Sequence, residues 1–347
     1  MNYKKHLINI NSTIKHALEL LSLLEHDMIL FATNEKQKLI GSLTDGDIRR
    51  GLLKGLSIEN SISDIINQKP KYIKKNEYSI NEIITLREEY YKVIPILDDD
   101  DLILNIISFR SLSSYLPIDV VLMAGGLGSR LKPLTDNTPK PLLKIEGKTI
   151  IDYNIDRLIS FGVDDFWISV RYLADKIKRH LGNGNNRNIN IEYVSENTPM
   201  GTIGAVSSID NFKHDYVLVT NSDILTNLNY EKFFLDFIEK EADMSVVTIP
   251  YDVEIPYAVL KTKNNNILSF EEKPTYTYYS NGGIYLIKKS ILKNIPKNKF
   301  FNSTDLMQLL LEKNLKLTSF PMYNYWLDIG KHSDFLKAKN DINHIKF

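Results

Sequence analysis

The sequence contains no cysteine, which excludes disulfide bonds and thiolate metal sites. It also lacks an excess of charge of one sign, because 43 basic residues balance 43 acidic ones. Because the chain has no excess of positive charge, we do not expect nucleic acid as a partner. No apolar run reaches the roughly 18 residues of a membrane span, and no signal-peptide core follows the N-terminal residues. We therefore expect a cytoplasmic protein without a membrane partner.

The length of 347 residues exceeds that of one typical domain. The linker near Pro117 predicts two domains, residues 1–116 and residues 117–347. Strands alternate with helices in the second domain, which indicates an α/β fold with a mostly parallel mixed sheet and helices on both faces. The first domain is expected to be a small α+β unit.

Within residues 1–116, a helix followed by two strands occurs twice, in units of about 60 residues, which indicates an internal duplication. Gly41–Arg49 and Val93–Leu97 resemble a tandem CBS pair, also called a Bateman module. The resemblance implies that a regulatory adenine nucleotide is held at Thr44 and Asp47, which match the ribose-binding Thr/Ser-x-x-Asp motif. The second copy departs from the motif, since serine stands at position 111. Alternatively, Thr44 and Asp47 cap the following helix, and the module is structural or dimerising.

A glycine-rich loop at residues 124–130 follows the short apolar run at residues 120–123, which predicts a buried strand. Three glycines in four positions allow the backbone to turn tightly and approach a ligand closely. The N–H groups of the turn, with Arg130 and Lys132, can form an anion site. No Walker A motif is present, and Leu131 replaces the third glycine of a dinucleotide fingerprint. An ordinary strand-to-helix turn is the alternative.

Two prolines flank Lys140 in the run Thr138–Leu142 and hold this lysine on a stiff segment. The loop and this run together resemble the sugar-1-phosphate nucleotidylyltransferases, whose signature is G-G-x-G-x-R-L followed by P-K-P. The resemblance implies a Rossmann-like nucleotidyltransferase domain. It also implies transfer of a nucleotidyl group from a nucleoside triphosphate to a sugar 1-phosphate, with release of pyrophosphate.

The resemblance also implies roles for individual residues. The catalytic residues would be Arg130, Lys140, Asp223 and Asp328. Asp223 and Asp328 would bind Mg²⁺, a hard cation that prefers carboxylate oxygens; their pairing rests on the resemblance, because about a hundred residues separate them. The nucleotide would be contacted by Leu122, Ala124, Gly125, Gly126, Gly128, Ser129, Arg130, Glu196, Gly201 and Thr202.

The sugar and its phosphate would be bound by the E-x-K-P and N-x-G segments. By resemblance, these supply Glu271, Lys273, Asn281 and Gly283, and Lys140 would reach the sugar phosphate. Glutamate suits hydroxyl donors, and lysine suits a phosphate. Without the resemblance, the run Glu271–Pro274 would be interpreted as an exposed charged turn.

Glu196 lies where the family often reads the base. Its carboxylate only accepts hydrogen bonds, so it can accept from N1–H and N2–H₂ of guanine but cannot donate to O2 or O4 of uracil or thymine. The residue therefore favours GTP over UTP or dTTP, unless it is a solvated loop residue.

A CBS pair ahead of a transferase resembles the guanylyltransferases of legionaminic acid synthesis, whose acceptor is glucosamine 1-phosphate. The same reaction with mannose 1-phosphate or another sugar, or with CTP, UTP or dTTP, stays open. A third hypothesis is a protein without enzymatic activity that only senses nucleotides through its CBS pair. We expect a homo-oligomer.

Overall fold

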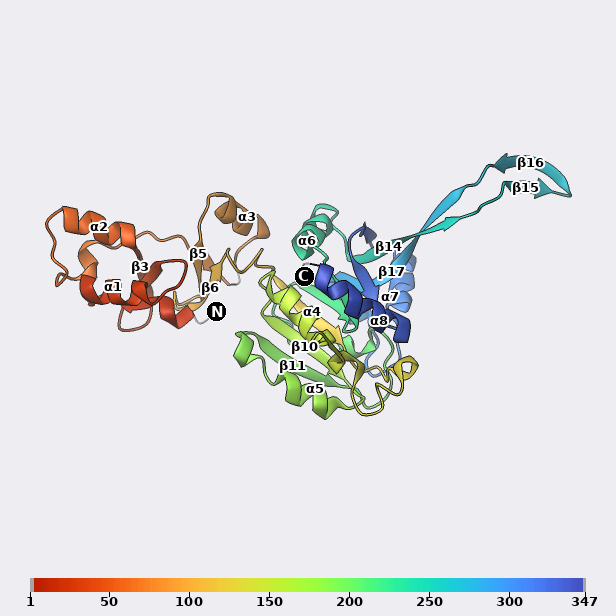
Figure 1. The fold of residues 1–347 in the computed structure, drawn as a ribbon, viewed down its shortest axis with the longest axis horizontal. Helices are drawn as coiled ribbons and strands as arrows, with labels where there is room; N and C mark the ends of the chain where they lie inside the picture. Colours follow the sequence, from red (N-terminus) through yellow and green to blue (C-terminus); the bar gives the residue numbers. More distant parts are fainter. Residues whose placement is uncertain (1–2, 76, 346–347) are drawn as a thin grey trace. The chain divides into compact units, whose positions relative to one another are not determined.

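The computed structural model describes residues 3–75 and 77–345 (Figure 1). The chain forms two compact units. One contains the residues up to Leu116 together with Ile159–Gly162 and Asn186–Asn188. The other contains Pro117–Leu158, Val163–Asn185 and the residues from Ile189 onward. Among the described residues, no helix is both long and apolar enough to cross a membrane.

The first unit repeats one topology. Its helices are α1 (Ile14–Ser22), α2 (Asp45–Leu53) and α3 (Ile80–Glu88). Its two three-stranded sheets are β1 (Leu7–Asn9), β2 (Ile29–Thr33) and β3 (Leu39–Thr44), and β4 (Ile73–Lys74), β5 (Val93–Leu97) and β6 (Ile103–Ser108). In each sheet the first pair is parallel and the second antiparallel. The predicted helix–strand–strand repeat is therefore present, with a short strand before each helix.

Thr44 and Asp47 form a capping box at the start of α2. The Thr44 hydroxyl accepts from the Asp47 N–H, and Asp47 Oδ2 accepts from the Thr44 N–H at 2.8 Å. Asp47 Oδ1 accepts from Arg50 at 2.5 Å. The predicted capping role is confirmed, because these bonds satisfy backbone donors that the first helical turn leaves free. Ribose binding by the same two residues stays a prediction.

The second unit is built on a seven-stranded sheet in the order β11-β10-β7-β12-β17-β14-β18. The strands are β7 (Ile118–Met123), β10 (Asp165–Val170), β11 (Asn190–Ser195), β12 (Tyr216–Asn221), β14 (Met244–Glu254), β17 (Thr275–Lys288) and β18 (Leu317–Pro321). Among the described strands of this sheet, only β17 runs antiparallel to its neighbours. The predicted α/β fold with a mostly parallel mixed sheet is confirmed.

Smaller elements complete this unit. Three short ladders pair β8 (Lys144–Ile145) with β9 (Lys148–Thr149), β13 (Ile224–Thr226) with β19 (Trp326–Asp328), and β15 (Val259–Lys263) with β16 (Asn266–Glu271). The helices are α4 (Ile150–Ile159), α5 (Ala174–Leu181), α6 (Tyr230–Glu239), α7 (Ser303–Glu312) and α8 (His332–Asp341).

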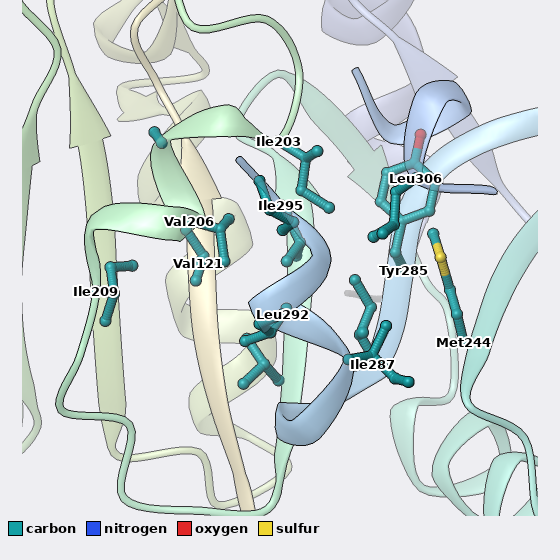
Figure 2. Close-up of a cluster of buried hydrophobic side chains, with 14 of the residues drawn as sticks. Val121, Ile203, Val206, Ile209, Met244, Tyr285, Ile287, Leu292, Ile295 and Leu306 are labelled. Carbon is teal, nitrogen blue, oxygen red and sulfur yellow. The ribbon is translucent and has the colours of Figure 1, made fainter. Parts of the chain in front are cut away.

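Helices cover both faces of the seven-stranded sheet. On one face, Val121 of β7 shares a buried apolar cluster with Leu306 of α7 (Figure 2). On the other, Tyr216 of β12 makes edge-on ring contacts with Phe234 and Phe237 of α6, at centroid distances of 5.2 and 5.9 Å. Such aromatic pairs add to the stabilisation from burial. The buried sheet leaves the carboxyl ends of the parallel strands as the place for a ligand.

An arm extends from this sheet. The outer halves of β14 and β17 are exposed and continue into the β15–β16 hairpin, which projects away from the sheet in Figure 1. Every residue of β16 is exposed, including Ile267, Leu268 and Phe270. The arm is the main departure from the compact α/β architecture that alternating strands and helices predict.

Candidate active site

The glycine-rich loop begins where three neighbouring parallel strands end. Ala124 N–H donates to the Ser169 carbonyl of β10 at 2.9 Å. The Ser222 hydroxyl, just after β12, donates to the Met123 carbonyl at 2.8 Å. These bonds hold the loop at the carboxyl edge of β10, β7 and β12, the edge at which open α/β sheets bind ligands.

Gly128 fixes the loop against Lys140. Its φ of +62° is in the left-handed region, which glycine adopts without strain. A methyl group added there would lie 3.0 Å from Thr135 Cγ2 and 3.1 Å from Lys140 Cβ. The Thr135 hydroxyl donates to the Gly128 carbonyl at 2.9 Å. The loop and the P-K-P segment thus form one packed unit, on which Ser129 and Arg130 are exposed.

Asp223 and Asp328 are brought together by a two-stranded ladder. In the pairing of β13 with β19, Ile224 lies opposite Asp328. Ile329 N–H also donates to the Asp223 carbonyl at 3.1 Å. The two carboxylates predicted to share a metal are therefore close enough to interact electrostatically, although they are far apart in the sequence.

Lys140 lies between these carboxylates. Its ammonium forms an ion pair with Asp223, and its Nζ is 3.8 Å from Asp328 Oδ1. The Lys140 side chain is only 12% exposed, so solvent screens the pair less than at the surface. Burial raises the pKa of the Asp328 carboxyl, and the Asp223 charge adds to this, whereas Lys140 and Arg130 oppose it. The four predicted catalytic residues therefore form one electrostatic group.

The donor set of this group fits a hard divalent cation. Asp223 Oδ1 is buried and has no hydrogen-bond partner among residues 3–75 and 77–345. The Asp328 side chain is 44% exposed and thus accessible to a ligand. Two carboxylates with a free buried oxygen suit Mg²⁺, which usually keeps several waters and binds one or two protein carboxylates together with substrate phosphates.

A pocket of about 320 Å³ adjoins this group. It is lined by Thr202, Asn221, Ile224, Asn281, Gly282, Gly283, Tyr285, Asn302, Ser303, Thr304, Trp326 and Asp328. Asn281 Oδ1 accepts from Gly283 N–H at 2.9 Å and from the Tyr285 hydroxyl at 3.0 Å. The Ser303 hydroxyl donates to Tyr285 at 2.8 Å. This chain fixes the Asn281 amide, and amides, hydroxyls and a carboxylate are groups that bind sugar hydroxyls.

Gly283 is confined by its surroundings. Its φ is +71°, and an added methyl group would lie 2.8 Å from Asn221 Nδ2 and 3.0 Å from Ile224 Cδ1. Trp326 Nε1–H donates to the Gly282 carbonyl at 2.9 Å, which ties β19 to β17. The pocket wall therefore depends on a residue without a side chain.

Glu196 is buried, with 9% of its surface exposed, so the alternative of a solvated loop residue is wrong. Its Oε1 accepts from the Ser169 hydroxyl, and its Oε2 accepts from the Met200 N–H at 3.2 Å. A methyl group added at Gly125 would lie 2.6 Å from Oε1. The carboxylate is thus held directly against the glycine-rich loop, with lone pairs still available on both oxygens.

Not all predicted site residues come together. Leu122 is fully buried in β7, and its predicted contact with a nucleotide stays a prediction. Gly201 and Thr202 lie against residues 301–303, and Thr202 faces the pocket. Glu271 and Lys273 lie beyond the outer end of the β14–β17 ladder, whose last pair is Glu254 with Thr275.

The structure therefore does not bring Glu271 and Lys273 to the pocket. Thr275 is six residues from Asn281 along β17, which corresponds to roughly 20 Å at the rise of a strand. Glu271 and Lys273 lie still farther from Asn281, beyond Thr275. Glu271 Oε2 accepts from the Tyr276 hydroxyl at 2.9 Å within the arm. In this conformation the segment is the exposed charged turn of the alternative interpretation, and its predicted contact with the sugar stays a prediction.

Several pocket residues were missed by the sequence reasoning. Asn221 ends the strand that carries Asp223, so its position at a strand end could have drawn attention. Tyr285 is four residues from Asn281 on the same strand, β17, but its side chain carries no signal of a pocket. Ser303 gives no local signal either, because only the fold brings it to Tyr285.

Comparison with known proteins agrees with this geometry. Residues 119–344 match the family model described as nucleotidyl transferase. The chain belongs to this family. It is 29% identical over 251 residues to the glucose-1-phosphate adenylyltransferase of Bacillus thuringiensis (strain Al Hakam), which covers 64% of this chain and 67% of that protein. A relative of the same name from Bacillus mycoides (strain KBAB4) is 28% identical over 251 residues.

Solved structures show the same fold. One is HddC from Yersinia pseudotuberculosis complexed with GMP-PN, at 29% identity and a TM-score of 0.50, covering 65% of this chain and 99% of that one. Another is named as a glucose-1-phosphate thymidylyltransferase from Bacillus anthracis, in complex with a sucrose. Its identity is 24% and its TM-score 0.54, covering 66% of this chain and 97% of that one. The predicted assignment to the sugar-1-phosphate nucleotidyltransferases is confirmed at this level. The matched region begins after the first unit, whose CBS character stays a prediction.

Proposed function

We propose that this nucleotidyltransferase transfers a nucleotidyl group from GTP to a hexosamine or hexose 1-phosphate, with glucosamine 1-phosphate as the preferred acceptor. The observation that carries the proposal is the position of Lys140 between Asp223 and Asp328, beside the glycine-rich loop and the pocket. A cationic group between carboxylates suits the alignment of two phosphates.

In the proposed reaction, a phosphate oxygen of the sugar attacks the α-phosphorus, and pyrophosphate leaves. This oxygen is already ionised at neutral pH, so no general base is required. The loop amides from Gly125 to Ser129 hold the triphosphate, and Arg130 binds its terminal phosphates. Lys140 stabilises the negative charge that develops on the phosphates. Asp223 and Asp328 would hold Mg²⁺, which when bound neutralises phosphate oxygens as a Lewis acid.

Guanine selection is assigned to Glu196. Guanine presents two adjacent donors to an acceptor-only carboxylate, whereas adenine presents only N6–H₂ beside an acceptor nitrogen, and uracil and thymine present acceptors on both sides of one N–H. The GMP-PN bound to HddC supports a guanine nucleotide at this fold. Other relatives are named for adenylyl and thymidylyl transfer, so activity with GTP is to be compared with activity with ATP and dTTP.

Pyrophosphate release with each of GTP, ATP, CTP, UTP and dTTP tests base selection, with Mg²⁺ and glucosamine 1-phosphate or mannose 1-phosphate. We expect the highest kcat/KM with GTP. In Glu196→Gln, the GTP-to-UTP ratio should fall by about 10- to 100-fold, because one hydrogen bond to a charged group is worth about 1.5–3 kcal/mol. Thr198→Ala is the control, because Thr198 is exposed and lies two residues after the buried Glu196. A parent enzyme that prefers UTP would contradict the Glu196 assignment.

For the first unit, we propose regulation by an adenine nucleotide. A cavity of about 1340 Å³ within this unit is lined by Thr44 and Asp47. Arg50, Lys92 and Arg110 bring positive charge to it, and Tyr90, Tyr91 and Phe109 bring aromatic rings. Basic groups suit phosphates and rings suit an adenine.

Calorimetry of AMP binding to the full chain tests this regulatory site. We expect saturable binding that weakens at least tenfold in Arg110→Ala, because a charged contact to phosphate is worth about 1.5–3 kcal/mol. Lys54→Ala is the control, since Lys54 is exposed and does not line the cavity. Binding of AMP that is equal in parent and Arg110→Ala would contradict the assignment, as would its absence from the parent.

A further inference from the structure

A second cluster of titratable side chains lies at the amino ends of the strands, at the opposite edge of the sheet from the glycine-rich loop. Asp119 is the second residue of β7 and pairs in register with Asp165 of β10. In-register residues of parallel neighbours point to the same face, about 4.8 Å apart. Asp119 is fully buried and Asp165 is 2% exposed. Two buried carboxylates side by side repel each other unless a cation lies nearby or one of them is protonated.

His214 completes this cluster from the segment just before β12. Its backbone N–H donates to Asp119 Oδ2 at 2.7 Å. Its Nε2 is 3.7 Å from Asp165 Oδ2. One ligand atom from each of Asp164, Asp165 and His214 lies within 4.8 Å of the others. The cluster therefore offers one imidazole nitrogen and two carboxylate oxygens to a common point.

One buried atom of the cluster points to a ligand. His214 Nε2 is buried and has no hydrogen-bond partner in the described part of the chain. The His214 side chain is only 10% exposed. A buried polar atom left without a partner costs free energy, so such atoms call for an explanation such as a bound ion.

We propose that Asp164, Asp165 and His214 bind a divalent transition-metal cation of the Zn²⁺ class, distinct from the Mg²⁺ proposed at Asp223. Imidazole with carboxylates suits Zn²⁺, whereas Mg²⁺ prefers oxygen ligands alone. Ligands about 2 Å from a tetrahedral Zn²⁺ lie roughly 3.4 Å apart, close to the 3.7 Å between His214 Nε2 and Asp165 Oδ2. The cation would join the start of β10 to the segment before β12.

Lys213 is an internal competitor for this cation. Its ammonium forms an ion pair with Asp165 Oδ1, and its side chain is 45% exposed. The lysine can therefore swing into solvent when a metal binds. A neutral residue at position 213 should therefore tighten metal binding. If the ion pair between Lys213 and Asp165 is purely structural, neither the parent nor the variant with a neutral residue at position 213 binds the metal.

The test is calorimetric titration of the full-length Asp223→Asn variant with Zn²⁺, together with the visible spectrum of bound Co²⁺. We expect a single Zn²⁺ equivalent, a Co²⁺ spectrum with nitrogen ligation, and a rise in Tm of several degrees with Zn²⁺, since a ligand that binds only the folded state stabilises it. Lys213→Met should bind Zn²⁺ more tightly. Absence of Zn²⁺ binding by Asp223→Asn would overturn the proposal.

His214→Gln in the same background should weaken Zn²⁺ binding by more than the roughly 10- to 100-fold that loss of an outer-shell group costs. His344→Gln is the matched control, because His344 is an exposed histidine of the same unit. If His214→Gln does not fold, Asp164→Asn, which is less buried, takes its place with the same expectation. Unchanged Zn²⁺ affinity in the folded variant would overturn the proposal.

Discussion

Asp223→Ala is expected to lower kcat at least about a hundredfold while the fold is retained. The substitution removes one of two carboxylates at the proposed metal site and leaves Lys140 paired only with the more distant Asp328. Single electrostatic contacts to a transition state are worth about 3–4 kcal/mol, which corresponds to roughly 10²–10³ in kcat. Initial rates of pyrophosphate release at saturating substrates, with circular dichroism to verify folding, measure the effect.

Lys140→Ala should lower kcat by a similar factor for a different reason. It removes the cation near the phosphates and leaves two neighbouring carboxylates to repel each other, so a loss of stability is also expected. Because Lys140 and Asp223 are in contact, their effects should not add in the double variant. Asp210→Asn is the control, since Asp210 pairs with Lys297 at the surface. Near-normal turnover in Asp223→Ala or Lys140→Ala would contradict the assignment of the site.

The second large effect is expected from Gly128→Ala. A left-handed residue other than glycine costs about 1–3 kcal/mol. The added methyl group would also press on Thr135 and on the stem of Lys140. We therefore expect the free energy of unfolding to fall by about that amount, and kcat to fall because Lys140 is displaced. Chemical denaturation and steady-state kinetics measure the two effects.

Gly126→Ala separates ligand contact from backbone strain. A methyl group at Gly126 meets nothing within 4 Å, and Gly126 is exposed. Stability should therefore change by less than about 0.5 kcal/mol, whereas KM for the nucleotide should rise if the triphosphate lies over the loop. An unchanged KM would argue against the loop as the triphosphate site, whatever the result for Gly128→Ala.

Sequence patterns were sufficient to predict those elements that are formed by residues close together in the chain. The apolar run before Ala124 predicted β7, and the prolines around Lys140 predicted a stiff segment that packs against Gly128. The capping box at Thr44 was predicted for the same reason, because its bonds span only three residues.

Contacts between distant segments could not be predicted from the residues themselves. Asp223 meets Asp328 because β13 pairs with β19, and two strands of three residues carry little sequence signal. The buried carboxylate of Glu196 accepts from the hydroxyl of Ser169, which only the fold brings to it. The exposure of the arm could not be predicted either, because apolar residues such as Phe270 usually indicate a buried strand.

The most direct test of the proposed nucleotidyl transfer is to follow a label on the α-phosphorus of GTP. The full-length enzyme is incubated with Mg²⁺, glucosamine 1-phosphate and GTP labelled at the α-phosphate, and the products are separated. If Lys140, Asp223 and Asp328 catalyse nucleotidyl transfer, the label appears in a nucleotide sugar, unlabelled pyrophosphate is released in equal amount, and Asp223→Ala slows the formation of both products at least about a hundredfold. Label found only in GMP, or no product with any sugar 1-phosphate and nucleoside triphosphate, would contradict the account.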